Sequence, residues 1–161
     1  MGTWPVTAIH LAQLTEDRVD DHTPRMPMIQ LIYASRPFDF DEGALAAILT
    51  VARSFNQRDG ITGALICRAD LFLQLLEGPE DLVDAAYRRI ERDRRHLEVR
   101  LLSRRAVTDR LFPGWTMRND PARSWMWDQE AVNGGAVERA TAAEAVAIFE
   151  RLARETPVRK D

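Results

Sequence analysis

The chain has 161 residues, of which 45% are hydrophobic and 29% are charged, and its formal net charge at pH 7 is −3. This composition is typical of a globular protein with one main domain, and the slightly negative charge argues against a surface built to bind nucleic acid. No apolar run approaches the roughly 20 residues that a membrane span needs, and the N-terminus lacks a secretory signal. A single cysteine rules out an internal disulfide, so we expect a cytoplasmic protein without membrane or nucleic-acid partners.

The N-terminal segment, residues 1–27, has a mixed composition and is expected to be an extension with one short helix near residues 8–14. The stretch "MIQLIYAS", residues 28–35, alternates two sets of side chains and predicts a strand. After a loop whose aspartates suit a helix cap, residues 42–57 repeat apolar side chains at helical spacing, and Gly60 ends this helix. The apolar positions are Leu45, Ile48, Leu49, Ala52 and Phe55.

A hairpin and a second helix are expected next. Residues 61–68 and 71–77 read as two apolar strands joined by a two-residue connection. The second helix is expected to begin at Pro79, because proline suits the first turn of a helix. Residues 97–107 predict a fourth strand, and the segment 112–117 leads into a short fifth strand.

This order of elements predicts an α+β fold: a ferredoxin-like βαββαββ sheet with both helices on one face, followed by C-terminal helices. We divide the chain into an N-terminal extension (1–27), a central domain (28–118) and a C-terminal helical extension (119–161). Within the last part, Thr141 and Glu144 form a capping box that opens a final helix. Its apolar stripe either covers the free face of the sheet or binds a partner, and it consists of Ala145, Val146, Phe149, Leu152 and Ala153.

Three polar side chains stand out on this frame. Gln74 lies in the apolar strand "FLQLLEG", where an unpaired amide costs about 1–3 kcal/mol. Tyr33 and Asn56 lie on the first strand and the first helix, and all three side chains converge if the helices pack on the sheet. Each has an ordinary explanation: a tyrosine at a core rim, an asparagine capping a helix, a glutamine bonding at a sheet edge. Together, around an apolar cleft, they suit a flat heteroaromatic ligand.

The three histidines show no metal-ligand spacing, and no metal site is predicted.

Five motifs in a fixed order carry a resemblance to a known family: "LIYAS", "NQRDGITGAL", "FLQLLEG", "DRRH" and "FPGWTM". With them the chain resembles a BLUF domain, the flavin-binding blue-light sensor family, over residues 28–118, and more narrowly a short-type BLUF photoreceptor. The resemblance implies a ferredoxin-like fold that holds FAD non-covalently between the two helices, with FMN or riboflavin as substitutes.

The resemblance also implies roles for individual residues. Tyr33 and Gln74 are similar to the family's photochemical pair, while Trp115 and Met117 match the pair that relays the signal. The positions that match cofactor-binding residues are Asn56, Ile48, Phe72, Arg89, Ile90, Arg95 and His96. Phe55 departs from the family pattern, which often has a polar residue there, and this removes one contact to the cofactor.

The mechanism implied by the resemblance starts with blue light exciting the flavin, to which Tyr33 donates an electron and then a proton. Gln74 relays the proton and is left rotated or tautomerised once the charges recombine. Its new hydrogen bond to the flavin shifts the absorption to the red. An amide suits this role because it presents either a donor or an acceptor to each neighbour.

No effector-enzyme signature follows residue 119, so we expect a sensor rather than an enzyme. We expect the signal to pass through strand five and the C-terminal helices to an unidentified downstream protein. We also expect the chain to form a homo-oligomer. One alternative is a flavin-free interaction module on the same fold, which a colourless purified protein would indicate. Another is an enzyme such as an acylphosphatase or a flavin reductase, but the loop "RPFDFDEG" does not resemble a phosphate cradle.

Overall fold

Five strands form one mixed sheet in the order β4-β1-β3-β2-β5 in the computed structural model, which describes residues 27–155 and 157. The strands are β1 (Met28–Pro37), β2 (Thr62–Arg68), β3 (Leu71–Pro79), β4 (His96–Ala106) and β5 (Arg118–Pro121). The helices are α2 (Glu42–Asp59), α3 (Glu80–Arg92), α4 (Gln129–Asn133), α5 (Ala136–Arg139) and α6 (Ala142–Arg154). The short helix expected near residues 8–14 lies outside the described residues.

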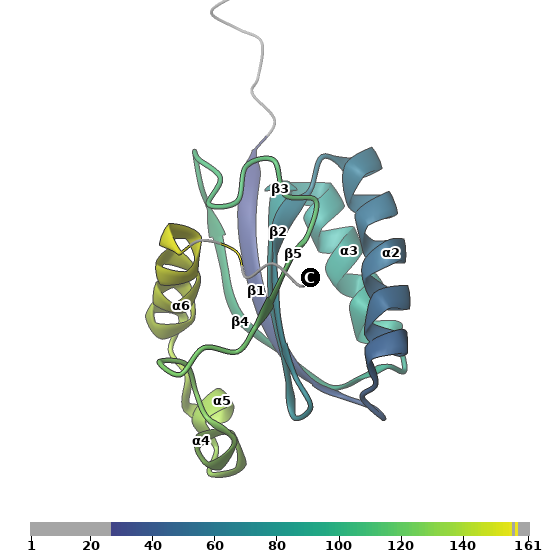
Figure 1. The fold of residues 1–161 in the computed structure, drawn as a ribbon. Coiled ribbons are helices and arrows are strands. Elements are labelled where there is room, and N and C mark those ends of the chain that lie inside the picture. Colours follow the sequence, from purple (N-terminus) through teal and green to yellow (C-terminus); the bar gives the residue numbers. More distant parts are fainter. Residues whose placement is uncertain (1–26, 156, 158–161) are drawn as a thin grey trace, which may run out of the picture.

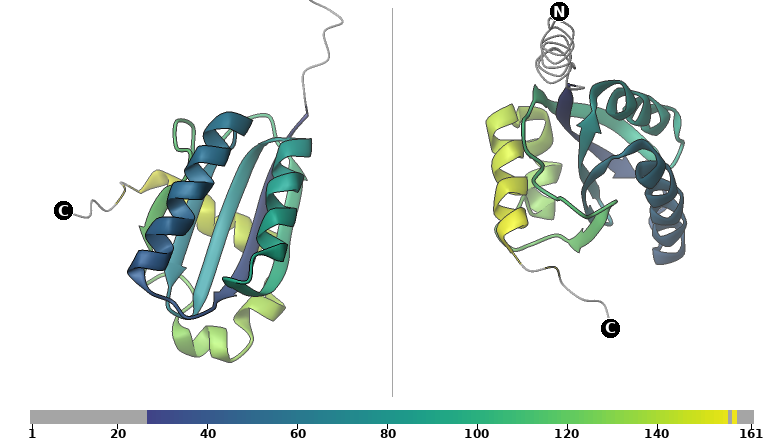
Figure 2. Two further views of the ribbon diagram at one scale, coloured as in Figure 1. Left: turned by 90° about the vertical axis from the view of Figure 1, so that its right-hand side faces the viewer. Right: turned by 90° about the horizontal axis from the view of Figure 1, so that it is seen from above.

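The molecule has three layers. Helices α2 and α3 lie side by side over one face of the sheet, and α6 lies on the opposite face (Figures 1 and 2). Each face therefore has its own core, and strand side chains alternate between the two. This arrangement confirms the predicted α+β, ferredoxin-like fold with both helices on one face and helices following it. None of the helices in the described part of the chain is long and apolar enough to cross a membrane.

The central strand β3 determines which residues face each other. It pairs antiparallel with β1 and with β2, and the short β5 extends the sheet by pairing parallel to β2. In the β1–β3 register Tyr33 lies directly opposite Gln74. Directly opposite residues on neighbouring strands have Cβ atoms about 4.5–5.5 Å apart, so the register alone brings the phenol and the carboxamide together.

The ends of α2 follow the sequence signals. Asp41 is the N-cap, and its Oδ1 accepts a hydrogen bond of 2.6 Å from the amide of Ala44. Gly60 closes the helix in the left-handed conformation with φ of 68°, which favours glycine. The second helix begins one residue later than expected, because β3 continues to pair with β1 up to Pro79. Pro79 is consequently the N-cap residue rather than the first residue of α3.

Helix α6 covers the free face of the sheet, which is one of the two outcomes that its apolar stripe allowed. Thr141 caps the helix, and its Oγ1 accepts a hydrogen bond of 3.1 Å from the amide of Glu144. Phe149 is fully buried and packs edge-on against Phe112, with ring centroids 6.3 Å apart. The stripe therefore belongs to the second core of the protein.

The segment before the fifth strand differs in detail from the expectation. The strand begins at Arg118, so Trp115 and Met117 lie in the connection that leads into it. This connection is attached to the sheet at Gly63, whose amide donates a hydrogen bond of 3.0 Å to the Trp115 carbonyl.

Candidate functional site

A pocket of about 230 Å³ opens between α2, α3 and the sheet. Its walls are mostly apolar, with two carboxamides and several charged groups among them. All nine residues predicted for the photochemical pair and the cofactor line it: Tyr33, Ile48, Asn56, Phe72, Gln74, Arg89, Ile90, Arg95 and His96. Residues separated by more than 60 positions in the sequence are thus brought into one site.

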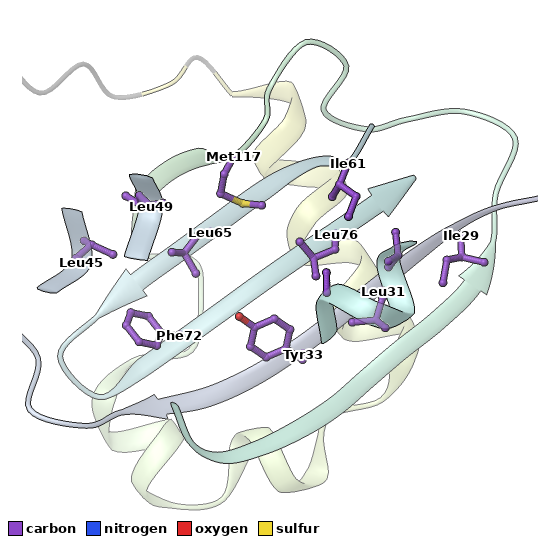
Figure 3. Packing of buried hydrophobic residues seen from close by; sticks show 12 residues of the cluster. Ile29, Leu31, Tyr33, Leu45, Leu49, Ile61, Leu65, Phe72, Leu76 and Met117 are labelled. Carbon is purple, nitrogen blue, oxygen red and sulfur yellow. The ribbon is translucent and has the colours of Figure 1, made fainter. Parts of the chain in front are cut away.

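Gln74 connects two buried side chains at the floor of this pocket. The Tyr33 hydroxyl donates a hydrogen bond to Gln74 Oε1, and Gln74 Nε2 donates to the Met117 sulfur at 3.2 Å. Figure 3 shows Tyr33, Phe72 and Met117 on the face of the sheet that α2 and α3 cover. The amide therefore uses its acceptor toward the phenol and its donor toward the thioether.

Tyr33 is fully buried, and burial raises the pKa of its hydroxyl far above the ordinary value. The phenol is therefore protonated and acts as a hydrogen-bond donor at neutral pH. Its ring lies among other rings: the Tyr87 centroid is 5.8 Å away and the His96 centroid is 6.0 Å away. Phe72 completes the group, with its centroid 5.1 Å from that of His96.

Asn56 is buried and does not cap α2. Its Nδ2 donates a hydrogen bond of 2.7 Å to the Thr116 carbonyl, while Gly60 provides the cap. One turn earlier on the same helix, Arg53 donates to the Met117 carbonyl from Nε at 3.2 Å and from Nη2 at 3.0 Å. Helix α2 thus holds the backbone at Thr116 and Met117, and the Met117 side chain contacts Gln74.

The mouth of the pocket carries a stacked cationic group. Two guanidinium groups lie over the ring of Phe55, that of Arg58 at 4.8 Å and that of Arg89 at 4.7 Å from the ring centroid. Asp59 accepts from Arg58 at 2.8 Å and lies 3.8 Å from Arg89. Because a flat aromatic ring attracts cations on its face, Phe55 helps to position both arginines across the gap between α2 and α3.

The "DRRH" segment contributes two separate pairs. Arg95 holds Asp93 by a pair of hydrogen bonds, and this contact lowers the pKa of the Asp93 carboxyl. His96 is buried, and its Nδ1 lies 2.8 Å from the Ser35 hydroxyl. Burial lowers the pKa of His96 below its ordinary value, so the ring is neutral at pH 7.

The buried histidine predicts a pH dependence of stability. An unfolded chain protonates histidine near about pH 6.5, whereas the folded protein does so only at lower pH, so stability falls as the pH drops through this window. We expect the free energy of unfolding, measured by urea titration, to be lower at about pH 5 than at about pH 7.5. His96→Gln, which keeps an amide able to bond Ser35, should reduce this difference. An equal pH dependence in the variant would contradict the assignment.

The relay pair divides between two environments. Met117 is 1% exposed and contacts Gln74, whereas Trp115 is 43% exposed, and neither lines the pocket.

Two residues that contact site residues, Ser35 and Arg53, were not predicted from the sequence. Ser35 carried a signal as a small polar residue in an apolar strand, whereas Arg53 on an exposed helix face carried none.

The arrangement as a whole suits a flat, polar-edged ring system. Apolar side chains form its walls, amides offer both donors and acceptors, and guanidinium groups at the mouth suit an anionic extension. The cavity is slightly smaller than the roughly 300 Å³ at the lower end of pockets for drug-sized ligands. One fused ring system therefore matches its size.

Comparisons with known proteins agree with this geometry. Residues 28–118 match the model of the family described as "BLUF: Sensors of blue-light using FAD". The chain is 39% identical over 74 residues to the photoactivated adenylate cyclase subunit beta of Euglena gracilis, a match that covers 45% of the chain and 9% of that protein. It is 38% identical over 71 residues to the blue light- and temperature-regulated antirepressor BluF of Escherichia coli, covering 43% of the chain and 17% of BluF.

The likeness extends to a solved structure of similar size. The dark-state structure of BlrB, a BLUF protein, is 30% identical, has a TM-score of 0.66 and matches over 80% of this chain and 98% of its own. The chain spans only a small part of the two curated relatives, so the match concerns one segment of each of them.

Proposed function

The chain belongs to the BLUF family, sensors of blue light that use FAD, and from this membership we propose that Tyr33 and Gln74 are the photochemical pair of this sensor. The observation that carries the proposal is the hydrogen bond from the buried Tyr33 hydroxyl to Gln74 Oε1 on the floor of the pocket. A buried phenol with a raised pKa retains its proton until it is oxidised, and the amide beside it offers the route for that proton.

The pocket residues suit the isoalloxazine ring of a flavin. Asn56 and Gln74 would hold its polar edge, and Ile48, Phe72 and Ile90 would flank it, in agreement with the apolar walls. Arg89, stacked on Phe55, would lie toward the phosphates, and Arg95 and His96 would contribute to the lining beside Phe72. Bound FAD would supply the absorption of blue light and an acceptor for one electron.

Tyr33 would give up one electron and its hydroxyl proton to bound FAD, and Gln74 would pass the proton through its amide. The electron and the proton would then return to Tyr33, so that the tyrosine is unchanged overall. Gln74 remains in a second arrangement, rotated or tautomeric, and the altered hydrogen bonds shift the absorption to longer wavelength. A planar amide has two such arrangements because its two ends are similar in size and opposite in hydrogen-bonding character.

Rotation of Gln74 has a consequence for Met117. A thioether sulfur accepts but does not donate hydrogen bonds, and at present it accepts from Gln74 Nε2. The rotated amide would present its oxygen to the sulfur, and this hydrogen bond would be lost. Met117 is therefore the residue through which the signal would leave the pocket toward β5 and the C-terminal helices, whereas exposed Trp115 would act only through its backbone.

We propose that the light signal is passed on as a changed contact with another protein or with a second copy of the chain. BluF, one of the relatives, is named as an antirepressor, which fits a BLUF domain that acts on a protein. The division of the chain into residues 1–27, 28–118 and 119–161 gives the middle part to light sensing and the last part to this output.

The direct test is the visible spectrum of the purified protein loaded with FAD, before and after a blue flash. We expect a yellow protein whose absorption shifts to longer wavelength and recovers in the dark. Tyr33→Phe should abolish the shift, because the ring keeps its packing but loses the transferable proton. The matched control is Tyr87→Phe, which removes the neighbouring phenol and should retain the shift. A surviving shift in Tyr33→Phe would refute the assigned pair.

A further inference from the structure

The residues on either side of one peptide bond, Met117 and Arg118, face opposite sides of the sheet. Met117 belongs to the core beneath α2 and α3 and accepts the hydrogen bond of Gln74. Arg118 is 3% exposed, and its guanidinium lies 5.9 Å from the ring centroid of Phe112, which belongs to the core beneath α6. A shift of the backbone at this peptide bond would therefore move both side chains.

Arg118 begins an ion cluster, here defined as Arg118, Asp120, Arg123 and Glu155, in which Arg118 and Asp120 are buried and Arg123 and Glu155 are partly exposed. Arg118 Nη2 donates to Asp120 Oδ1 at 3.1 Å and to the Glu155 carbonyl at 3.0 Å. Arg123 links the same two residues, donating to Asp120 Oδ1 and to Glu155 Oε2, each at 3.1 Å. Because Glu155 is the C-cap of α6, the cluster connects β5 to the end of the last helix.

The contact between Arg118 and Asp120 is incomplete. Arg118 Nε lies 2.8 Å from Asp120 Oδ2 in an ion pair, but of the two contacts between these groups only that of Nη2 with Oδ1 has the geometry of a hydrogen bond. A buried ion pair is weak evidence of added stability, because apolar residues in its place are often equally stable. A pair with one hydrogen bond made and another unmade changes its energy when the guanidinium shifts slightly.

We propose that Arg118 is a positioning residue that couples the Gln74–Met117 contact to the end of α6 through Asp120, Arg123 and Glu155. This inference rests on the proposed function, since it takes the two arrangements of Gln74 as the switch. In the dark arrangement the cluster holds Arg118, and hence Met117, where the sulfur accepts from Gln74. Loss of that hydrogen bond releases Met117 and loosens the hold of Arg118 on the carbonyl of Glu155.

Coupling between two sites is reciprocal, so a weakened cluster must alter the photocycle. Glu155→Gln removes the charge that binds Arg123 while leaving the pocket and its lining residues intact. It should favour the lit arrangement and slow the dark recovery of the spectrum by about two- to fivefold, the range for one partly exposed ion pair. In the wild-type protein, illumination should also speed hydrogen exchange of the Glu155 amide, which bonds the Leu152 carbonyl in the dark.

Two controls separate this effect from a general effect on α6. Glu150→Gln removes an exposed acid of the same helix, 3.9 Å from Arg105, and should recover at the wild-type rate. Arg151→Gln removes the longer ion pair of Glu155, in which Arg151 Nε lies 3.8 Å from Oε1, and should also recover at the wild-type rate. Recovery of Glu155→Gln at the wild-type rate, or hydrogen exchange at Glu155 unaffected by light, would overturn the coupling alone. A wild-type spectrum that ignores light would overturn the proposed function, and the coupling with it.

Discussion

Gln74→Leu is expected to abolish the light-induced shift of the absorption spectrum while leaving the fold intact. Leucine has a similar size, but it neither accepts from the Tyr33 hydroxyl nor donates to the Met117 sulfur, and so it has no second hydrogen-bonded arrangement. The measurement is the light-minus-dark difference spectrum of the FAD-loaded variant. A persisting red shift would show that the spectral change does not originate at this amide.

The chain offers a matched control for this variant. Gln30 is also a buried glutamine in the sheet, but it faces the opposite side, where its Oε1 accepts from Arg105 and its Nε2 lies 3.4 Å from Glu77. Gln30→Leu should lower stability through the loss of these contacts and retain the red shift. If both leucine variants lost the shift, the effect would be one of folding rather than of position.

Glu77→Ala is expected to cause a large loss of stability. Glu77 is fully buried, and its carboxylate accepts hydrogen bonds of 2.8 Å from the backbone amides of both Leu111 and Phe112. It also accepts from the hydroxyl of Thr62 at 3.1 Å. Alanine would leave these donors without partners, at a cost of about 2–5 kcal/mol in the free energy of unfolding, measured by urea titration.

Glu77→Gln provides the graded comparison. Its single carbonyl oxygen can satisfy one of the two amides, so the loss should be clearly smaller than for alanine. A change of less than about 0.5 kcal/mol for Glu77→Ala would mean that the loop before Met117 is held by other contacts. Because a typical domain is stable by only about 5–15 kcal/mol, the expected loss is a large fraction of the total.

Local patterns were sufficient for most of the fold. The caps at Asp41, Gly60 and Thr141 lie where the sequence predicted them, because capping depends on residues only a few positions apart. The start of α3 was misplaced because the pairing of Pro79 with β1 is a long-range interaction. The apolar stripe of α6 had two outcomes, and only the packing of Phe149 on Phe112 decided between them.

At the candidate site, too, local patterns predicted some features and missed others. The alternation within single strands put Tyr33 and Gln74 on buried faces, and their motif carried the family resemblance. The sequence did not reveal that Asn56 bonds the Thr116 carbonyl rather than capping its helix. Nor did it reveal that the guanidinium groups of Arg58 and Arg89 both lie over the ring of Phe55, since Arg89 comes from a different helix.

The sequence by itself determined the order of the elements, their buried faces and the identity of the residues around the pocket. Only the tertiary structure decided that Met117 rather than Trp115 contacts Gln74, and that Arg118 reaches Glu155 across the second core. The physical reason is the range of the interactions. Helical and strand periodicity are properties of neighbouring residues, whereas a hydrogen bond between residues 43 positions apart depends on the register of the whole sheet.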